Sequence, residues 1–194
     1  MKIKNVGLKS FPIILAICAI CLCFPKVLRS ETVMLSVGYG YLFPNDSGFK
    51  GVYGKSVRLP EFKLGVRFIS DFYLYGSFFT FSKDGLTPEL QESAHSKQQF
   101  LGGGIGYFPN LTKNKKWKGF AGVGVMNVNY KEETMELLVK GNKIGFLIEC
   151  GLYFREKYMF LGLNAAYVEA KDTYEEVNFK MGGARTSVVL GFIF

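Results

Sequence analysis

A chain of 194 residues has room for one domain, with or without a targeting segment. With 48% hydrophobic and 16% aromatic residues, the composition argues against disorder, because disordered chains are poor in aromatic side chains. No apolar run reaches ~18 residues, which excludes a bundle of transmembrane helices. The formal net charge of +8 would suit a nucleic-acid binder.

The N-terminus has the pattern of a secretory signal peptide. Three lysines precede an apolar run from Phe11 to Phe24, which is too short to cross a bilayer as a helix. The alternatives are a lipoprotein signal around Cys18 and a buried helix of the mature fold. We predict that residues 1–30 are cleaved and that residues 31–194 form the domain.

Cleavage would change the charge and the cysteine inventory. The first thirty residues hold five of the basic residues and none of the acidic ones, so a net charge of about +3 would remain. A nucleic-acid partner is therefore not expected, since binding to phosphate backbones needs a clustered positive surface. Cys150 would be the single remaining cysteine, and neither a metal site nor a cofactor is predicted.

From residue 33 onward the chain alternates with a period of two, which marks half-buried β-strands. Lys143–Phe154 is the clearest case, with large apolar residues at the even positions and lysine, glycine and glutamate among the odd ones. Similar patterns occupy residues 33–43, 61–68, 98–107, 158–167 and 185–194. Residues 72–81 and 117–130 are also strand-like, but both of their faces are apolar or glycine-rich, so these faces stay unassigned.

The eight strands share one large apolar face and one face of small residues and scattered charge. An eight-stranded barrel is narrow and is filled by its own side chains. We therefore predict that the small and charged face points inward and that the large face contacts lipid. A closed barrel leaves no backbone group unpaired in hydrocarbon. The expected fold is an all-β, eight-stranded antiparallel up-and-down transmembrane β-barrel, with tyrosines such as Tyr153 and Tyr158 in interfacial girdles.

The connections between the strands alternate in length. Four long connections are expected at residues 44–55, 82–97, 131–142 and 171–183, with shorter ones between them. Tight turns on one side and long loops on the other are typical of an up-and-down barrel in a membrane.

These features resemble the small eight-stranded outer-membrane β-barrels of the OmpA, OmpX and OmpW kind, over essentially all of residues 31–194. The sharpest local motif is the C-terminus, where Gly191, Phe192 and Phe194 end the last strand. In that family such a terminus is read by the barrel assembly machinery, so the resemblance implies an assembly signal at these three residues. It also implies location in the cell outer membrane of a Gram-negative envelope, contact with outer-membrane lipids and lipopolysaccharide, and a monomeric barrel.

Six charged residues fall on the face that is predicted to be inside the barrel. A buried charge needs a partner, so we interpret them as a mutually neutralising network that plugs the interior. The alternative is an ion path lined by the same side chains. The six residues are Glu61, Lys63, Arg67, Lys143, Glu149 and Arg185.

His95 is the only imidazole of the chain, and Ser93 and Ser96 lie close to it in the expected connection 82–97. A histidine with serines near it in a long loop resembles the outer-membrane enzymes that modify lipid A, but a nucleophile and its base must also meet in space. The family-specific contexts of those enzymes are not found here. We therefore assign no catalytic residues and expect that the chain is not an enzyme.

The expected function is a structural, envelope-integrity or surface-interaction role, exerted through long extracellular loops. The alternatives are a narrow channel for small apolar solutes, which the OmpW likeness implies, a lipid A-modifying enzyme, and a soluble periplasmic binder of the lipocalin kind.

Overall fold

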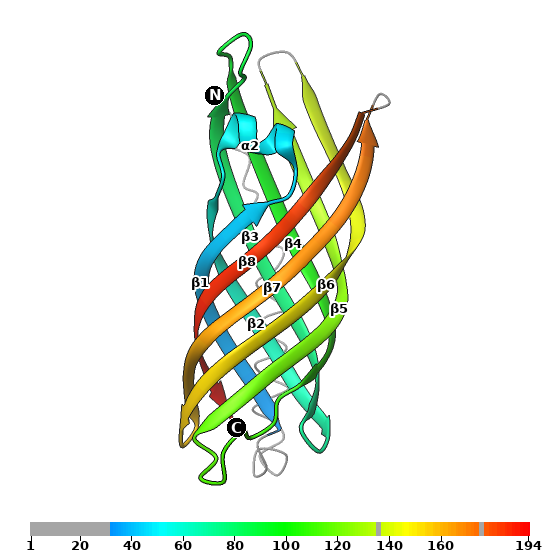
Figure 1. Cartoon of the computed structure of the whole chain (residues 1–194). Helices are drawn as coiled ribbons and strands as arrows, with labels where there is room; N and C mark the ends of the chain where they lie inside the picture. The colour runs from blue at the N-terminus through cyan, green and yellow to red at the C-terminus, as the bar shows by residue number, and fades with distance from the viewer. Residues whose placement is uncertain (1–31, 135–136, 175–176) are drawn as a thin grey trace, which may run out of the picture.

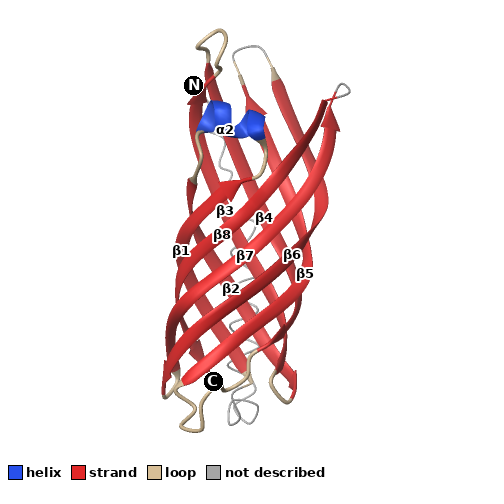
Figure 2. Cartoon of the chain, viewed as in Figure 1, coloured by secondary structure: helices blue, strands red, loops and turns tan. Residues whose placement is uncertain are grey.

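The computed structural model describes residues 32–134, 137–174 and 177–194, so the predicted signal peptide at residues 1–30 lies outside the described residues. Eight antiparallel strands close into a barrel in chain order, as expected from the sequence (Figures 1 and 2). The strands are β1 (Val33–Pro44), β2 (Val57–Ile69), β3 (Phe72–Leu86), β4 (Ser93–Tyr107), β5 (Trp117–Glu133), β6 (Leu138–Glu156), β7 (Met159–Tyr174) and β8 (Val177–Ile193).

A short helix, α2 (Ser47–Tyr53), lies in the connection between β1 and β2. It begins where the Asp46 carboxylate accepts a hydrogen bond of 2.9 Å from the Phe49 N–H, and it ends at Gly54, whose φ of 92° suits glycine. Figure 2 shows this helix across one end of the barrel. Among the described residues, no helix is long and apolar enough to cross a bilayer.

The two ends of the barrel differ. The connections β2–β3, β4–β5 and β6–β7 lie at one end together with the C-terminus, which we call the turn end (Figure 1). The other end, the loop end, carries α2 and the hairpins β3–β4, β5–β6 and β7–β8. The up-and-down order of the connections is as expected, but their predicted alternation in length is wrong, because the β4–β5 connection at the turn end (residues 108–116) is longer than the β3–β4 connection at the loop end (residues 87–92).

The predicted loop boundaries are wrong at the loop end. Most of residues 82–97, 131–142 and 171–183 is paired strand, and the strands run for 12 to 19 residues in place of about ten. Pairing continues up to Leu86↔Ser93 and Glu133↔Leu138. The outward face becomes polar where a strand leaves the apolar band, and in the sequence this change of polarity has the same pattern as the end of a strand.

The last residue takes part in closing the barrel. The backbone of Val33 donates to the carbonyl of Phe194 at 3.1 Å, and Phe194 donates back to Val33 at 2.9 Å. Strand β1 then pairs with β8 from Met34↔Ile193 to Pro44↔Gly183. Within the described residues, the sheet thus pairs with itself around the full circle, as lipid-exposed backbone requires.

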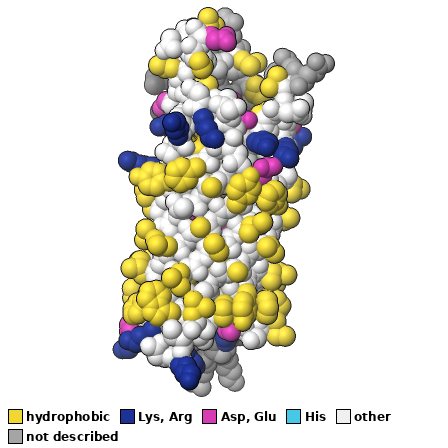
Figure 3. Space-filling model, in the orientation of Figure 1, with side chains coloured by type: hydrophobic (Ala, Val, Ile, Leu, Met, Phe, Trp, Pro, Cys, Tyr) yellow, Lys and Arg dark blue, Asp and Glu magenta, His cyan; other side chains and the backbone are white. Residues whose placement is uncertain are grey.

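The outer surface carries the large apolar side chains, which confirms the predicted orientation. Ile144 is 76% exposed and Leu163 is 65% exposed on this surface. Figure 3 shows hydrophobic side chains in a broad band, with charged side chains gathered above and below it. Aromatic pairs mark both edges of the band, such as Phe146–Tyr167 towards the loop end and Trp117–Phe154 towards the turn end. A surface of this kind is stable against acyl chains and not against water.

The interior of the barrel holds more large side chains than the sequence pattern predicted. Strands β3 and β5, whose faces could not be assigned, turn Tyr73, Phe79 and Phe120 into the barrel, where they are buried. Tyr153 also points inward and is buried, so its expected place in a girdle is wrong. Glycine makes room for this bulk: a β-carbon on Gly106 would lie 2.5 Å from the ring of Phe120.

Candidate functional site

An aromatic plug fills the barrel nearest the turn end. Phe108 leaves the β4–β5 connection, enters the barrel and is fully buried. Its ring contacts those of Phe120, Tyr153 and Phe160 edge-on, at centroid distances of 6.0, 5.5 and 5.7 Å. Lys118 donates to the Phe108 carbonyl at 3.2 Å and lies over the same ring at 4.7 Å. The turn end is therefore packed like a protein core.

Four charged side chains meet in the middle of the barrel, and the sequence had placed all four on the inward face. Lys63 binds Glu149 directly and lies 3.8 Å from Glu61. Arg185 reaches Glu61 at 3.1 Å and Glu149 at 3.7 Å. Two positive and two negative groups thus neutralise one another, although all four are almost inaccessible to solvent.

Neutral polar groups complete this cluster. Ser187 donates to Glu61 at 2.8 Å, and Asn164 donates to Glu149 at 3.2 Å. The Tyr153 hydroxyl in turn donates to the Asn164 carbonyl oxygen at 3.1 Å. These bonds offset part of the cost of removing the carboxylates from water.

The two remaining members of the predicted network lie elsewhere. Lys143 is at the loop-end mouth of the barrel, where its ammonium lies 3.0 Å from Asp172. Arg67 is half-buried near the turn-end limit of β2, where its backbone N–H donates to Thr32 at 2.7 Å. The structure therefore brings four of the six residues together. Alternation along a strand gives the face of a residue but not its height relative to residues on other strands.

An apolar core lies between the charge cluster and α2. Phe79 and Phe100 stack at 4.4 Å with their rings almost parallel, and Arg185 lies 4.4 Å over the Phe79 ring. The helix closes this region, since Phe49 packs edge-on against Phe81 at 6.0 Å. Buried side chains thus occupy the barrel at three successive levels.

The helix is fixed to the barrel wall by a polar contact. The Tyr53 hydroxyl donates to the Glu132 carboxylate at 2.7 Å, and Ser96 donates to the same carboxylate at 2.6 Å. Burial and this hydrogen bond raise the pKa of the Tyr53 hydroxyl, so Tyr53 keeps its proton and remains a donor.

A row of lysines runs across the outer surface near the loop end. Lys97 on β4 is directly opposite Lys131 on β5, and Lys131 is directly opposite Lys140 on β6. Directly opposed side chains have β-carbons about 5 Å apart, and like charges in such pairs are destabilising. Glu133 binds Lys131 at 2.5 Å, whereas no carboxylate of the described residues lies within ion-pair distance of Lys97 or Lys140. We call Lys97, Lys131 and Lys140 the lysine row.

The lysine row lies just beyond the apolar band. On β4, Gln99 separates Lys97 from the exposed Leu101, and on β6, Asn142 separates Lys140 from the exposed Ile144. The headgroup layer of a bilayer adjoins its hydrocarbon on this side. A second opposed pair, Lys171 and Lys180, lies on β7 and β8. Neither set can be recognised in the sequence alone, because only the register between strands makes these lysines neighbours.

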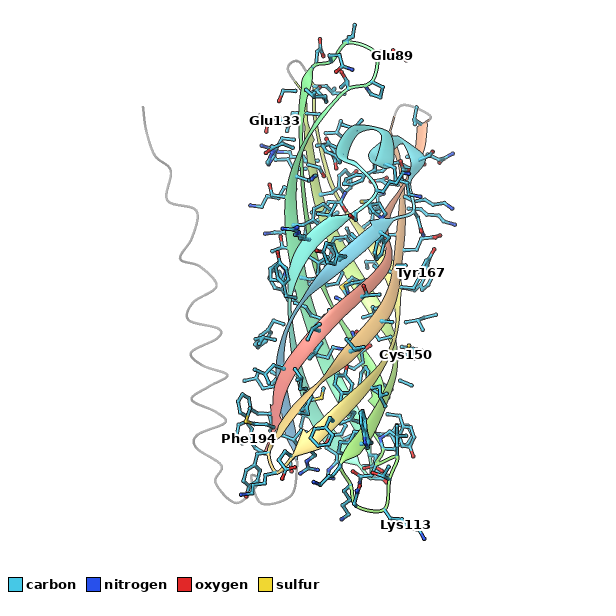
Figure 4. The ribbon with its side chains drawn as sticks, turned by 60° about the vertical axis from the view of Figure 1, so that its left-hand side comes forward. Glu89, Lys113, Glu133, Cys150, Tyr167 and Phe194 are labelled. Atoms are coloured by element: carbon cyan, nitrogen blue, oxygen red, sulfur yellow. The ribbon has the colours of Figure 1, made fainter. Side chains whose placement is uncertain are left out.

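The predicted assembly signal lies at the turn end, where Figure 4 labels Phe194. Phe192 and Phe194 face outward and stack at 6.2 Å, whereas Gly191 adjoins the buried ring of Phe160. His95, expected in a loop, is instead in β4, and this correction changes its neighbours. Ser96 points inward to Glu132, and His95 points outward opposite Asp84.

A closed eight-stranded barrel with an apolar outer band and a packed, charge-neutral interior defines a small transmembrane β-barrel of the outer-membrane type. The sequence matches no family model and no curated protein. Solved structures do match. The outer membrane protein OprG of Pseudomonas aeruginosa is 13% identical, with a TM-score of 0.64, over 84% of this chain and 96% of that one.

Two further barrels have similar folds. Neisserial surface protein A is 12% identical, with a TM-score of 0.58, over 85% of this chain and 98% of that one. Ail, the attachment invasion locus protein of Yersinia pestis, solved in complex with the heparin analogue sucrose octasulfate, is 16% identical, with a TM-score of 0.56, over 84% of this chain and 97% of that one. At such identities, the similarity establishes the fold alone.

Proposed function

We propose that this protein is a closed barrel of the outer membrane that binds the phosphate groups of outer-leaflet lipids and so strengthens the envelope. The observation that carries the proposal is the lysine row beside the apolar band. Lys131 is directly opposite both Lys97 and Lys140, so like charges adjoin and repel, and a bound polyanion offsets that repulsion. Lipopolysaccharide is a lipid that carries such phosphates, and the anionic sugar analogue bound by Ail supports an anion site on a barrel of this fold.

The packed interior supports a structural role over a channel. A solute moving along the barrel would have to displace the aromatic plug, the four-charge cluster and the core around Phe79 and Phe100. Export through residues 1–30, and recognition of Gly191, Phe192 and Phe194 by the assembly machinery, belong to the same proposal.

Changing all three lysines of the row to glutamine should weaken binding of lipopolysaccharide by about 100-fold, because each lysine near an anionic lipid surface contributes about 1 kcal/mol. Binding would be measured by thermophoresis of the detergent-solubilised protein at two salt concentrations. The affinity of the native protein for lipopolysaccharide should also fall more steeply with salt concentration than the affinity of the variant, because salt screens the charges of the row.

A matched control is available at the other end of the barrel. Lys113, Lys115 and Lys116 lie in the β4–β5 connection, and Figure 4 labels Lys113 at the end opposite Glu133. Changing these three lysines to glutamine removes the same charge and should leave binding nearly unchanged. If both triple variants lost the same affinity for lipopolysaccharide, the net charge of the protein, and not the lysine row, would drive binding.

A further inference from the structure

Three side chains with complementary chemistry meet on the outer surface near the loop end. Ser82 and Asp84 are two residues apart on β3, so both point outward. His95 on β4 is directly opposite Asp84 in the register, and Lys97 is directly opposite Ser82. The pairing of β3 with β4 thus places a hydroxyl, an imidazole and a carboxylate side by side.

The contacts have the order of a nucleophile, its base and an orienting acid. The Nδ1 atom of His95 lies 2.6 Å from the Asp84 carboxylate, and its Nε2 atom lies 3.0 Å from the Ser82 hydroxyl oxygen. A carboxylate only accepts hydrogen bonds, so in the neutral imidazole Nδ1 carries the proton and Nε2 is left to accept from Ser82. This geometry activates a serine for attack on an acyl carbon.

The surroundings indicate the class of substrate. Ser82 follows Thr80 and the outward, exposed Phe78 along β3, so it lies just beyond the apolar band, in the layer of lipid headgroups. Lys97, the first member of the lysine row, is its cross-strand partner. A phosphate-bearing lipid held by the row would present its acyl esters beside Ser82. The side chains of His95 and Asp84 are 43% and 86% exposed, so a lipid can reach them from outside.

We propose that Ser82, His95 and Asp84 form a catalytic triad that hydrolyses an acyl ester of an anionic outer-leaflet lipid. The choice of an anionic lipid rests on the proposed function, whereas the triad itself does not. The proposal departs from the expectation that the chain is not an enzyme. That expectation considered Ser93 and Ser96, the serines closest to His95 in sequence, and not those brought to it by the register.

The reaction has two steps. Ser82 gives its proton to His95 Nε2 while its oxygen bonds to the ester carbonyl carbon, and the lipid alkoxide then leaves with that proton, which yields an acyl-serine. Water next gives a proton to His95 Nε2 while its oxygen bonds to the acyl carbon. The bond between the acyl carbon and the Ser82 oxygen then breaks, and His95 returns the proton to that oxygen, which releases a fatty acid and restores Ser82. Asp84 stays ionised throughout and accepts the hydrogen bond from Nδ1. Lys97 is directly opposite Ser82 in the register, so we assign stabilisation of the oxyanion to its ammonium.

The test uses the full-length protein, folded into vesicles, with fatty-acid release followed by mass spectrometry. Vesicles that contain lipopolysaccharide, phosphatidylglycerol or phosphatidylcholine distinguish the lipid sources. Ser82→Ala, His95→Ala and Asp84→Asn should each lower the rate by about 10³-fold or more. Ser93→Ala is the matched control, because Ser93 is on the same face two residues from His95 but is paired with Leu86, and its rate should not change. Mobility of unheated samples on gels confirms that each variant is folded.

A fluorophosphonate probe gives an independent readout. It should label Ser82, and the label should disappear in Ser82→Ala and decrease in His95→Ala. No ester cleavage together with no labelling would overturn the triad and leave lipid binding by the lysine row standing. Equal cleavage of anionic and phosphatidylcholine vesicles would retain the triad but contradict the lysine row as the substrate-binding element.

Discussion

Replacing Glu149 by leucine should destabilise the folded barrel by about 3–5 kcal/mol, because it leaves a buried positive charge without compensation. Lys63 and Arg185 would then share the single carboxylate of Glu61. Asn164 would also lose its acceptor. Unfolding in urea, followed through Trp117, the only tryptophan, measures the change directly.

The double variant Lys63→Met, Glu149→Leu is the matched control. It removes one charge of each sign and keeps the pair of Arg185 and Glu61. Replacement of a buried ion pair by apolar residues is often neutral, so this variant should regain most of the lost stability. The interpretation of the cluster as a neutralised plug would be wrong if the single variant were as stable as the native protein, or if the double variant were the less stable of the two.

Replacing Leu163 by arginine should destabilise the barrel in a bilayer by about 2–4 kcal/mol, the cost of a charge facing lipid near the midplane of a barrel. Leu163 is 65% exposed, is the middle one of the five outward residues from Met159 to Tyr167 on β7, and pairs with Leu152 and Val188. In water such a change would alter stability by less than about 0.5 kcal/mol, because it would only add a charge to an exposed surface.

Val177→Arg provides the comparison. Val177 is 66% exposed and begins β8 at the loop end, beyond the apolar band. Replacing Val177 by arginine should leave the stability of the barrel nearly unchanged, because the free-energy cost of a lipid-facing charge falls towards the edge of the bilayer. Similar effects at Leu163 and Val177, in vesicles of the same composition, would argue that the band does not contact hydrocarbon.

The closed barrel and its orientation could be predicted because alternation is a local property. It placed Glu61, Lys63, Glu149 and Arg185 on the inner face correctly. Their partners could not be predicted, since contacts between β2, β6 and β8 depend on how the closed sheet tilts. In β3 and β5 both faces carry large apolar residues or glycine, so alternation did not indicate which face of these strands points into the barrel.

The structure of the loop end was harder to predict for a related reason. Polar residues between Ser82 and Lys97 suggested a loop, whereas a strand that emerges from lipid changes the polarity of its outward face and keeps its pairing. Asp84 and His95 are neighbours only through that pairing, and so are the members of the lysine row. A hairpin register centred on residues 87–92 would have revealed the first set, whereas the lysine row also needs the registers of β4 with β5 and of β5 with β6.

The outward orientation of the apolar face is tested most directly at Cys150. This cysteine is exposed on the outer surface, between Ala121 and Ala165 in the register, and Figure 4 shows it part-way along the barrel, far from both ends. With Cys18, Cys21 and Cys23 changed to serine, it is the only thiol of the chain. A nitroxide attached there, in vesicles, should collide with oxygen dissolved in the lipid and be shielded from a water-soluble nickel chelate. Ready access of the chelate, with little effect of oxygen, would contradict a lipid-facing surface.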